Sequence, residues 1–143
     1  NDAKRELLEI GRFVNQLPVS ECEVLYGRAG YLHAIEFVRS ETEDGEFAKE
    51  LARQIVRDII REGIKVANES TTNLPLLWVW HGTAYLGAIH GVAGILFTLL
   101  CFYDEVMLVD DDAIAKIKGT IAALDEMCLP SGNLTSSLGK ERE

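Results

Sequence analysis

The chain has 143 residues, 48% of them apolar and 26% charged, which is the composition of a folded globular domain and excludes a disordered protein. Its formal net charge is −9, and Lys and Arg never form a run, so we expect no nucleic-acid partner. The N-terminus has no apolar signal core, which predicts a cytoplasmic protein.

The first predicted helix ends at Pro18 and has one apolar face, formed by Leu7, Ile10, Val14 and Leu17. The next segment resembles a capping box, with Ser20 at the N-cap and Glu23 three residues later. We therefore expect Glu23 either to cap a helix or to take part in chemistry. The acidic stretch from 41 to 46 is predicted to be a solvated loop.

Two copies of one glycine signature stand at 26–32 and 90–96: Tyr-Gly-Arg-Ala-Gly-Tyr-Leu and His-Gly-Val-Ala-Gly-Ile-Leu. Gly27 and Gly91 are 64 positions apart, and so are Gly30 and Gly94, which indicates an internal repeat. Each signature opens into an apolar, helix-like run. Glycines at such a point allow close backbone packing, and they also leave N–H groups free to face a ligand.

Between the signatures, residues 46–62 alternate two apolar and two polar positions, as an outer helix with one solvent-facing side does. Gly63 is placed to cap its C-terminus. A further amphipathic helix is predicted from 110 to 128, with Ile114, Ile117, Ile121, Leu124 and Cys128 on one face. No segment alternates with period two for long enough to predict a strand, so the fold class is all-α.

The uncharged residues from 84 to 103 are numerous enough to cross a bilayer. The run nevertheless holds His90, contains several glycines and lacks flanking Lys or Arg, so a buried helix is the favoured interpretation. Peripheral membrane association stays open. Cys22, Cys101 and Cys128 show no Cys-x-x-Cys or Cys-His spacing, and their apolar or helical surroundings predict buried, inert thiols.

Three segments, CEVLYGRAGYLHAI, WHGTAYLGAIHGVAGIL and LPSGNLTSS, resemble the lanthionine synthetase C-like family in order and spacing, and its eukaryotic, glutathione-linked branch most. The resemblance implies an α/α toroid of inner and outer helices with Gly-x-x-Gly motifs at the inner-helix entrances. Residues 1–143 would then be a single domain that forms an incomplete segment of this toroid.

The chemistry that the resemblance implies is the zinc-dependent addition of a thiol, from glutathione or a peptide Cys, to dehydroalanine or dehydrobutyrine residues of a peptide. The family's zinc-binding Trp-Cys-His-Gly segment and its later Cys-His pair are not in this sequence. Family order puts them after the Pro-Ser-Gly-Asn stretch, so we assign no metal ligand within the segment. Zinc is expected as a cofactor held elsewhere.

His90 matches a family histidine with an acid/base role, and Glu23 stands where the bacterial cyclases carry a catalytic Asp. Both are predicted catalytic residues, although a core histidine remains an alternative for His90. Arg28 is predicted either to bind a substrate carboxylate or to be an exposed loop cation. His81, between Trp80 and Gly82, is expected to be structural.

Two other functions are compatible with the sequence. One is a non-enzymatic adaptor that keeps the toroid and binds glutathione or a signalling partner. The other is a carbohydrate-active α/α toroid, which would need paired carboxylates around a glycosidic bond. On the thiol-addition hypothesis, the segment alone is expected to be inactive and to self-associate through helix faces that lack neighbours.

Overall fold

The computed structural model describes residues 2–139. This part of the chain forms six helices: α1 (Asp2–Val14), α2 (Arg28–Thr42), α3 (Lys49–Glu69), α4 (Val92–Cys101), α5 (Tyr103–Val109) and α6 (Ala113–Glu126). Within the described ranges the only β-type pairings are two isolated bridges, Trp80 with Thr83 and Tyr85 with Ser137. The all-α class predicted from the sequence is confirmed.

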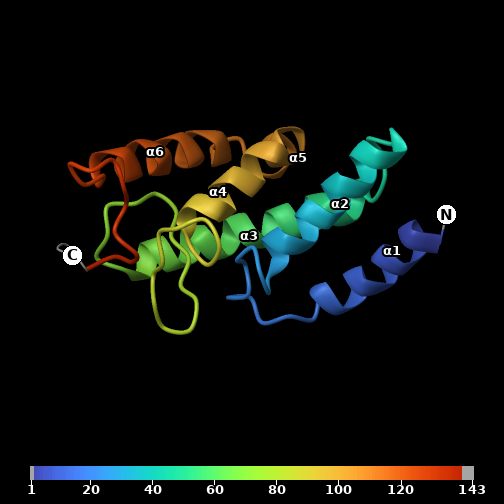
Figure 1. Cartoon of the computed structure of the whole chain (residues 1–143), viewed down its shortest axis with the longest axis horizontal. Helices are drawn as coiled ribbons and strands as arrows, with labels where there is room; N and C mark the ends of the chain where they lie inside the picture. The colour runs from blue at the N-terminus through green and yellow to red at the C-terminus, as the bar shows by residue number, and fades with distance from the viewer. Residues whose placement is uncertain (1, 140–143) are drawn as a thin grey trace.

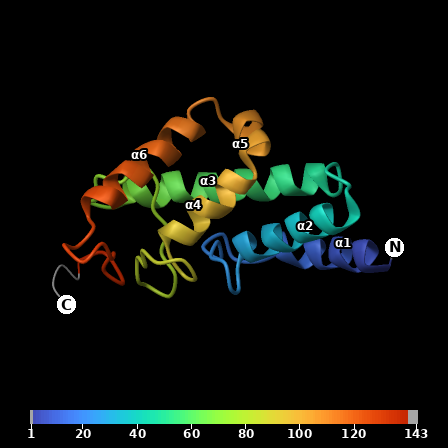
Figure 2. The ribbon, with the colours of Figure 1, turned by 45° about the horizontal axis from the view of Figure 1, so that its top comes forward.

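The long helix α3 runs through the middle of the molecule, and α2 and α5 pack directly against it (Figure 1). The helices α2 and α4 contact each other, and α5 and α2 both lie on α3. The two loops that lead into α2 and α4 lie side by side in both views (Figures 1 and 2). A main-chain hydrogen bond joins them, from the Val24 N–H to the Ile89 carbonyl over 3.1 Å. The two glycine signatures therefore meet in space.

Helix α3 has the two-sided character predicted from its sequence, but it does not end at Gly63. Its apolar side is fully buried at Ala52, Ile55, Val56 and Ile59. The helix continues to Glu69, and Gly63 lies inside it, where a Cβ atom would stand 2.5 Å from the indole ring of Trp78. The Trp78 Nε1–H donates to the Ile59 carbonyl at 2.9 Å. Gly63 thus makes room for the aromatic ring of Trp78, and the prediction that it caps the C-terminus of the helix was wrong.

The first helix is shorter than predicted, because it ends at Val14 and not at Pro18. Val14 is buried and Leu7 and Leu17 pack against the core, whereas Ile10 is 51% exposed. Gly11 takes the inner place on this face, where a Cβ would meet the Tyr31 hydroxyl at 2.6 Å. The Tyr31 O–H donates to the Leu7 carbonyl, which ties α1 to α2.

The apolar run from 84 to 103 is not one helix. Residues 84–91 form the turn before α4, and Phe102 separates α4 from α5. None of the described helices is long and apolar enough to span a membrane by itself; α4 and α5 pass that test only as a pair, which is bent by 94°. The predicted single buried helix was wrong in length, although α4 itself is largely buried.

Helix α6 confirms the amphipathic helix predicted after Asp110, with one change of face. Ile117 and Leu124 are buried as expected, but Ile121 is 39% exposed. Thr120 is buried instead, and its hydroxyl accepts a hydrogen bond from the Leu76 N–H at 3.1 Å. A polar residue therefore occupies the core face because it satisfies a buried backbone donor.

Candidate functional site

The two glycine signatures form the same backbone turn. In the first, the N–H groups of Arg28 and Ala29 donate to the carbonyls of Glu21 and Cys22 at 3.0 and 3.2 Å. In the second, the N–H groups of residues 92 and 93 donate to the carbonyls of residues 85 and 86 at 3.0 and 3.1 Å. Each bond recurs after 64 positions, so the sequence repeat is also a structural repeat. The first N–H groups of both helices are bonded within the protein.

The second glycine of each signature is required by close backbone contact. A Cβ on Gly30 would stand 2.1 Å from the Val24 carbonyl oxygen, and one on Gly94 would stand 1.9 Å from the Ala88 carbonyl oxygen. Real side chains do not approach a backbone atom so closely. Gly27 and Gly91 are similarly confined, with backbone atoms within 2.6 Å of the Cβ position. The geometry therefore assigns these glycines to packing.

Glu23 lies in the first turn, and its side chain is 1% exposed. No helix begins at Ser20, because α2 starts only at Arg28, so the predicted capping box does not form. The Glu23 carboxylate instead accepts hydrogen bonds at both oxygens: Oε1 from the Tyr26 N–H, and Oε2 from Nδ1 of His90 at 2.6 Å. The two residues predicted as catalytic are 67 positions apart in sequence and in direct contact in the fold.

His90 ends the second turn, one residue before Gly91, with 30% of its side chain exposed. Its bond to the carboxylate places the proton on Nδ1 when the ring is neutral, which leaves Nε2 as the acceptor. Among the described residues, none forms a hydrogen bond with Nε2. Because the side chain is partly exposed and Nε2 has no such partner, this nitrogen can exchange a proton with a bound molecule, as the histidine of an acid/base pair does.

Aromatic rings surround His90, and sequence reasoning gave them no role. The Trp80 indole lies parallel to the imidazole, with centroids 4.2 Å apart and planes within 1°. Tyr26 is parallel to His90 at 6.3 Å, and Tyr85 is tilted to it at 6.0 Å. Both tyrosines stand inside or beside the glycine signatures. The sequence did contain one signal of this arrangement, because aromatic residues cluster next to both glycine signatures.

A tight turn fixes Trp80. Trp80 and Thr83 exchange two main-chain hydrogen bonds of 3.0 Å, and the residues between them, His81 and Gly82, both have positive φ, at 48° and 76°. This is the pattern of a type I′ hairpin turn, in which glycine at the second central position is favoured. The indole Nε1–H donates to Oε2 of Glu21 at 3.2 Å. His81 therefore has the structural place expected of it, at a turn.

Arg28 is not the exposed loop cation that was one alternative, because it is 2% exposed. Its guanidinium donates to the main-chain carbonyls of Leu17, Pro18 and Glu21 at 2.9, 2.7 and 3.3 Å. These bonds brace the loop between α1 and α2. With both terminal nitrogens occupied by backbone, the geometry gives no support to a substrate-binding role for Arg28.

The described residues do not form a metal site. Between residues 2 and 139, no three His, Cys, Asp or Glu side chains are grouped so that they could hold a metal ion. The thiol of Cys22 is fully buried, and burial raises its pKa to about 12, which disfavours the thiolate that a metal binds. Cys101 and Cys128 are exposed, contrary to the prediction of buried thiols. The donors in this part of the chain do not fit zinc.

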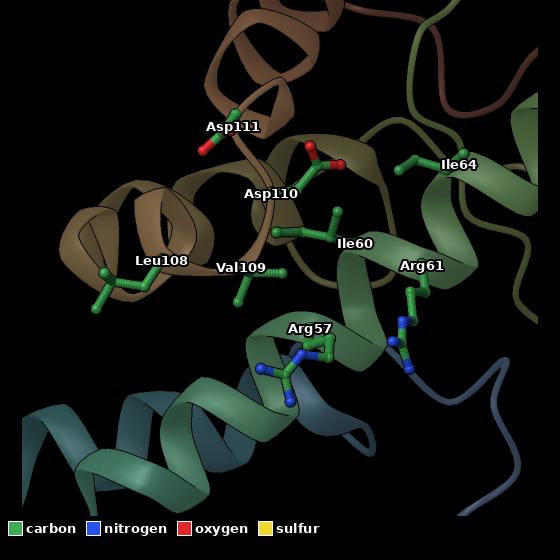
Figure 3. Close-up of a pocket in the computed structure, with 8 residues that line it drawn as sticks. All are labelled: Arg57, Ile60, Arg61, Ile64, Leu108, Val109, Asp110 and Asp111. Atoms are coloured by element: carbon green, nitrogen blue, oxygen red, sulfur yellow. The ribbon is translucent and has the colours of Figure 1, made fainter.

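A hollow of about 350 Å³ lies away from the motifs (Figure 3). Arg57 and Arg61 reach it from α3, and Asp110 and Asp111 reach it from the link between α5 and α6. No residue of either glycine signature lines it. The chemistry-bearing residues predicted from the sequence meet at the paired turns instead.

Comparison with known proteins identifies the family of the chain. Residues 2–140 match the model of the lanthionine synthetase C-like protein family. Glutathione S-transferase LANCL1 of Danio rerio is 28% identical over 123 residues, and LanC-like protein GCL1 of Arabidopsis thaliana is 34% identical over 122 residues. Each match covers 85% of this chain, and the chain spans 30% and 27% of those two relatives. The chain belongs to the lanthionine synthetase C-like family.

Proposed function

We propose that the protein adds a thiol, either that of glutathione or that of a peptide cysteine, to dehydroalanine or dehydrobutyrine residues of a peptide. Family membership and the name of the Danio rerio relative, a glutathione S-transferase, support this chemistry. The observation that carries it is the pair of Glu23 and His90, whose Oε2 and Nδ1 atoms lie 2.6 Å apart, with 30% of the His90 side chain exposed.

The reaction needs one proton to be moved. A thiol loses its proton and its sulfur bonds to the β-carbon of the dehydroamino acid, which leaves an enolate that must be protonated at the α-carbon. In this proposal Nε2 of His90 receives the thiol proton and later delivers it to that carbon. No net proton is gained or lost, and one C–S bond replaces the C=C π bond. A histidine suits both steps near neutral pH.

Glu23 is the positioning partner of His90. Its buried carboxylate accepts from Nδ1, which fixes the ring orientation and stabilises the imidazolium that forms when Nε2 takes a proton. The second carboxylate oxygen is held by the Tyr26 N–H, so both oxygens of the Glu23 side chain are anchored. The carboxylate cannot turn away from His90 without losing a buried hydrogen bond.

Zinc belongs to this proposal as a group held by residues outside the described part of the chain. A bound zinc ion lowers the pKa of a coordinated thiol and so supplies the nucleophilic thiolate. Residues 2–139 offer no cluster of ligands for it. His90 therefore serves the reaction by moving a proton, and Glu23 serves it by positioning His90.

The test is addition of glutathione to a dehydroalanine peptide by the natural protein, followed by mass spectrometry. His90→Gln and Glu23→Gln are expected to lower the rate by roughly 10²-fold or more, the contribution typical of a general acid/base. Glu9→Gln, an exposed carboxylate on α1, is the matched control and should leave the rate unchanged. Full activity in His90→Gln would reject the role of His90, and no thioether product with the unmodified protein would reject the function.

A further inference from the structure

A hollow of about 450 Å³ opens beside the paired turns, and nothing in the proposed chemistry uses it. Its lining comes from two loops: Leu17, Pro18, Glu21 and Tyr26 from the first, and Trp80 and His81 from the second. The volume is in the range of small-ligand pockets. The walls are mainly apolar and aromatic, and Glu21 is the one acidic side chain in the lining.

The carboxylate of Glu21 has no cationic partner. Among residues 2–139, no Lys or Arg nitrogen lies within ion-pair distance of it, although it is half-buried. Arg28 is nearby, but its guanidinium is bonded to the main-chain carbonyls of the same loop. One carboxylate oxygen accepts from the Trp80 indole at 3.2 Å, and the other has no hydrogen-bond partner within the described chain. A half-buried carboxylate in this state attracts a cation.

The aromatic walls favour the same charge. The rings of Tyr26 and Trp80 are parallel to within 6°, with centroids 6.0 Å apart, and Tyr26 is 65% exposed. The face of an indole or phenol ring attracts a positive group within about 6 Å of its centroid. Leu17 and Pro18 add apolar surface, against which a methylene chain can lie while its charged end reaches Glu21.

We propose that this pocket, formed by Leu17, Pro18, Glu21, Tyr26, Trp80 and His81, binds a lysine or arginine side chain of a peptide. The methylene stem lies on the apolar wall, and the cationic head meets the Glu21 carboxylate and the exposed ring of Tyr26. The chain as a whole carries a net charge of −9, which adds a long-range attraction for basic peptides. This binding does not depend on the thiol-addition chemistry, because neither His90 nor Glu23 lines the pocket.

The experiment follows the indole N–H signal of Trp80 by NMR in the natural protein, assigned by its loss in Trp80→Phe. Trp78 is the internal control, because its indole is buried and donates to the Ile59 carbonyl. N-acetyl-lysine-N-methylamide and the arginine counterpart are titrated, and the uncharged norleucine counterpart matches their stem. We expect a saturable shift of the Trp80 signal with both cationic probes, no shift at Trp78, and binding of norleucine at least about tenfold weaker.

Glu21→Gln is the decisive variant, because glutamine keeps an acceptor for the indole and removes only the charge. We expect it to weaken lysine binding at least about tenfold while the norleucine affinity stays the same. Equal affinity for lysine and norleucine would overturn the proposal, as would lysine binding unchanged in Glu21→Gln. Absence of any saturable shift in a protein whose Trp78 signal remains native would overturn it as well.

Discussion

The indole ring of Trp80 lies flat against the imidazole ring of His90, with the two centroids 4.2 Å apart. The residues are ten positions apart in sequence and belong to the same loop before α4. Glu23 fixes His90 through a hydrogen bond at one edge, and Trp80 confines the ring from its face. The imidazole ring is thus held at one edge by a hydrogen bond and on one face by stacking.

Trp80 is therefore expected to act as a positioning residue for His90. Trp80→Leu removes the flat surface and should lower kcat for thiol addition roughly tenfold or more, because small misplacements of a catalytic group are costly. Trp80→Phe keeps a planar ring and should retain most of the activity. The measurements are kcat and KM together with the NMR titration of the His90 ring. An unchanged titration and kcat in Trp80→Leu would show that the stacking is incidental.

Gly94→Ala tests whether the signature glycines are required for packing. The new methyl would stand 1.9 Å from the Ala88 carbonyl oxygen, so the turn must shift, and we expect a loss of about 3 kcal/mol in the free energy of unfolding. Helix propensity alone predicts the opposite sign, a gain of about 1 kcal/mol. Gly87→Ala is the control, because its Cβ position has no neighbour within 4 Å. Urea unfolding measures both, and a stabilised Gly94→Ala would contradict the close approach.

The buried ion pair of Arg39 and Glu105 joins α2 to α5, with 3.0 Å between Nη1 and Oε1 and both side chains 9% exposed. Arg39→Met leaves a buried, unpaired carboxylate and should cost about 3 kcal/mol. The double variant with Glu105→Leu removes both charges and should recover most of that loss. Arg5→Met, which breaks the exposed pair with Asp2, should cost less than about 1 kcal/mol. A double variant no more stable than Arg39→Met would argue against an ionic penalty.

The three cysteines should differ in reactivity. At pH 8, iodoacetamide is expected to modify Cys101 and Cys128, which are exposed, and to spare Cys22. Burial raises the pKa of Cys22 to about 12, so its reactive thiolate is scarce at that pH, and the side chain is enclosed as well. Cys101 should react more slowly than free cysteine, because partial burial and the nearby Glu36 raise its pKa. Peptide mapping by mass spectrometry measures the order, and modification of native Cys22 would contradict its burial.

The Cys22 thiol also predicts alkaline instability. Its pKa rises from 9.0 in a free thiol to about 12 in the fold, so between these values the unfolded chain has lost a proton that the folded chain keeps. The unfolded state then binds fewer protons, and the free energy of unfolding falls as pH rises above about 9. Cys22→Ala should flatten this fall, as followed by urea unfolding at a series of pH values. An equally steep fall in Cys22→Ala would assign it to other groups.

Periodicity and repetition predicted the larger features, because they depend on local chemistry. The helical stripes of α3 and α6 and the two glycine turns follow directly from residue spacing. The continuation of α3 past Gly63 did not, because Gly63 packs against the ring of Trp78, a residue beyond the helix. The sharp break at Phe102 was also beyond local reasoning, since an uninterrupted apolar run carries no mark of a 94° bend.

The candidate site shows the same division. Glu23 and His90 were identified by the family positions that they match, and only the fold shows that they touch. The local pattern of Ser20 and Glu23 predicts a helix cap. In the fold the Glu23 carboxylate accepts a hydrogen bond from His90, which is 67 positions away in the sequence. The burial of Arg28 could not be predicted, because the loop carbonyls that accept from its guanidinium cannot be placed from the sequence. The Arg39–Glu105 ion pair could not be predicted from local sequence, because its two residues are 66 positions apart.

The hydrogen bond between the Val24 N–H and the Ile89 carbonyl has a consequence for how the protein acquires its site. It closes a loop that contains all of α2 and α3, and closing a long loop is an entropic cost that only many later contacts offset. Each turn is closed by its own main-chain bonds, but the site exists only when the two turns meet. The approach of Glu23 to His90 should therefore be a late event in folding, and a chain that has formed its helices but not docked them would carry both residues and no site.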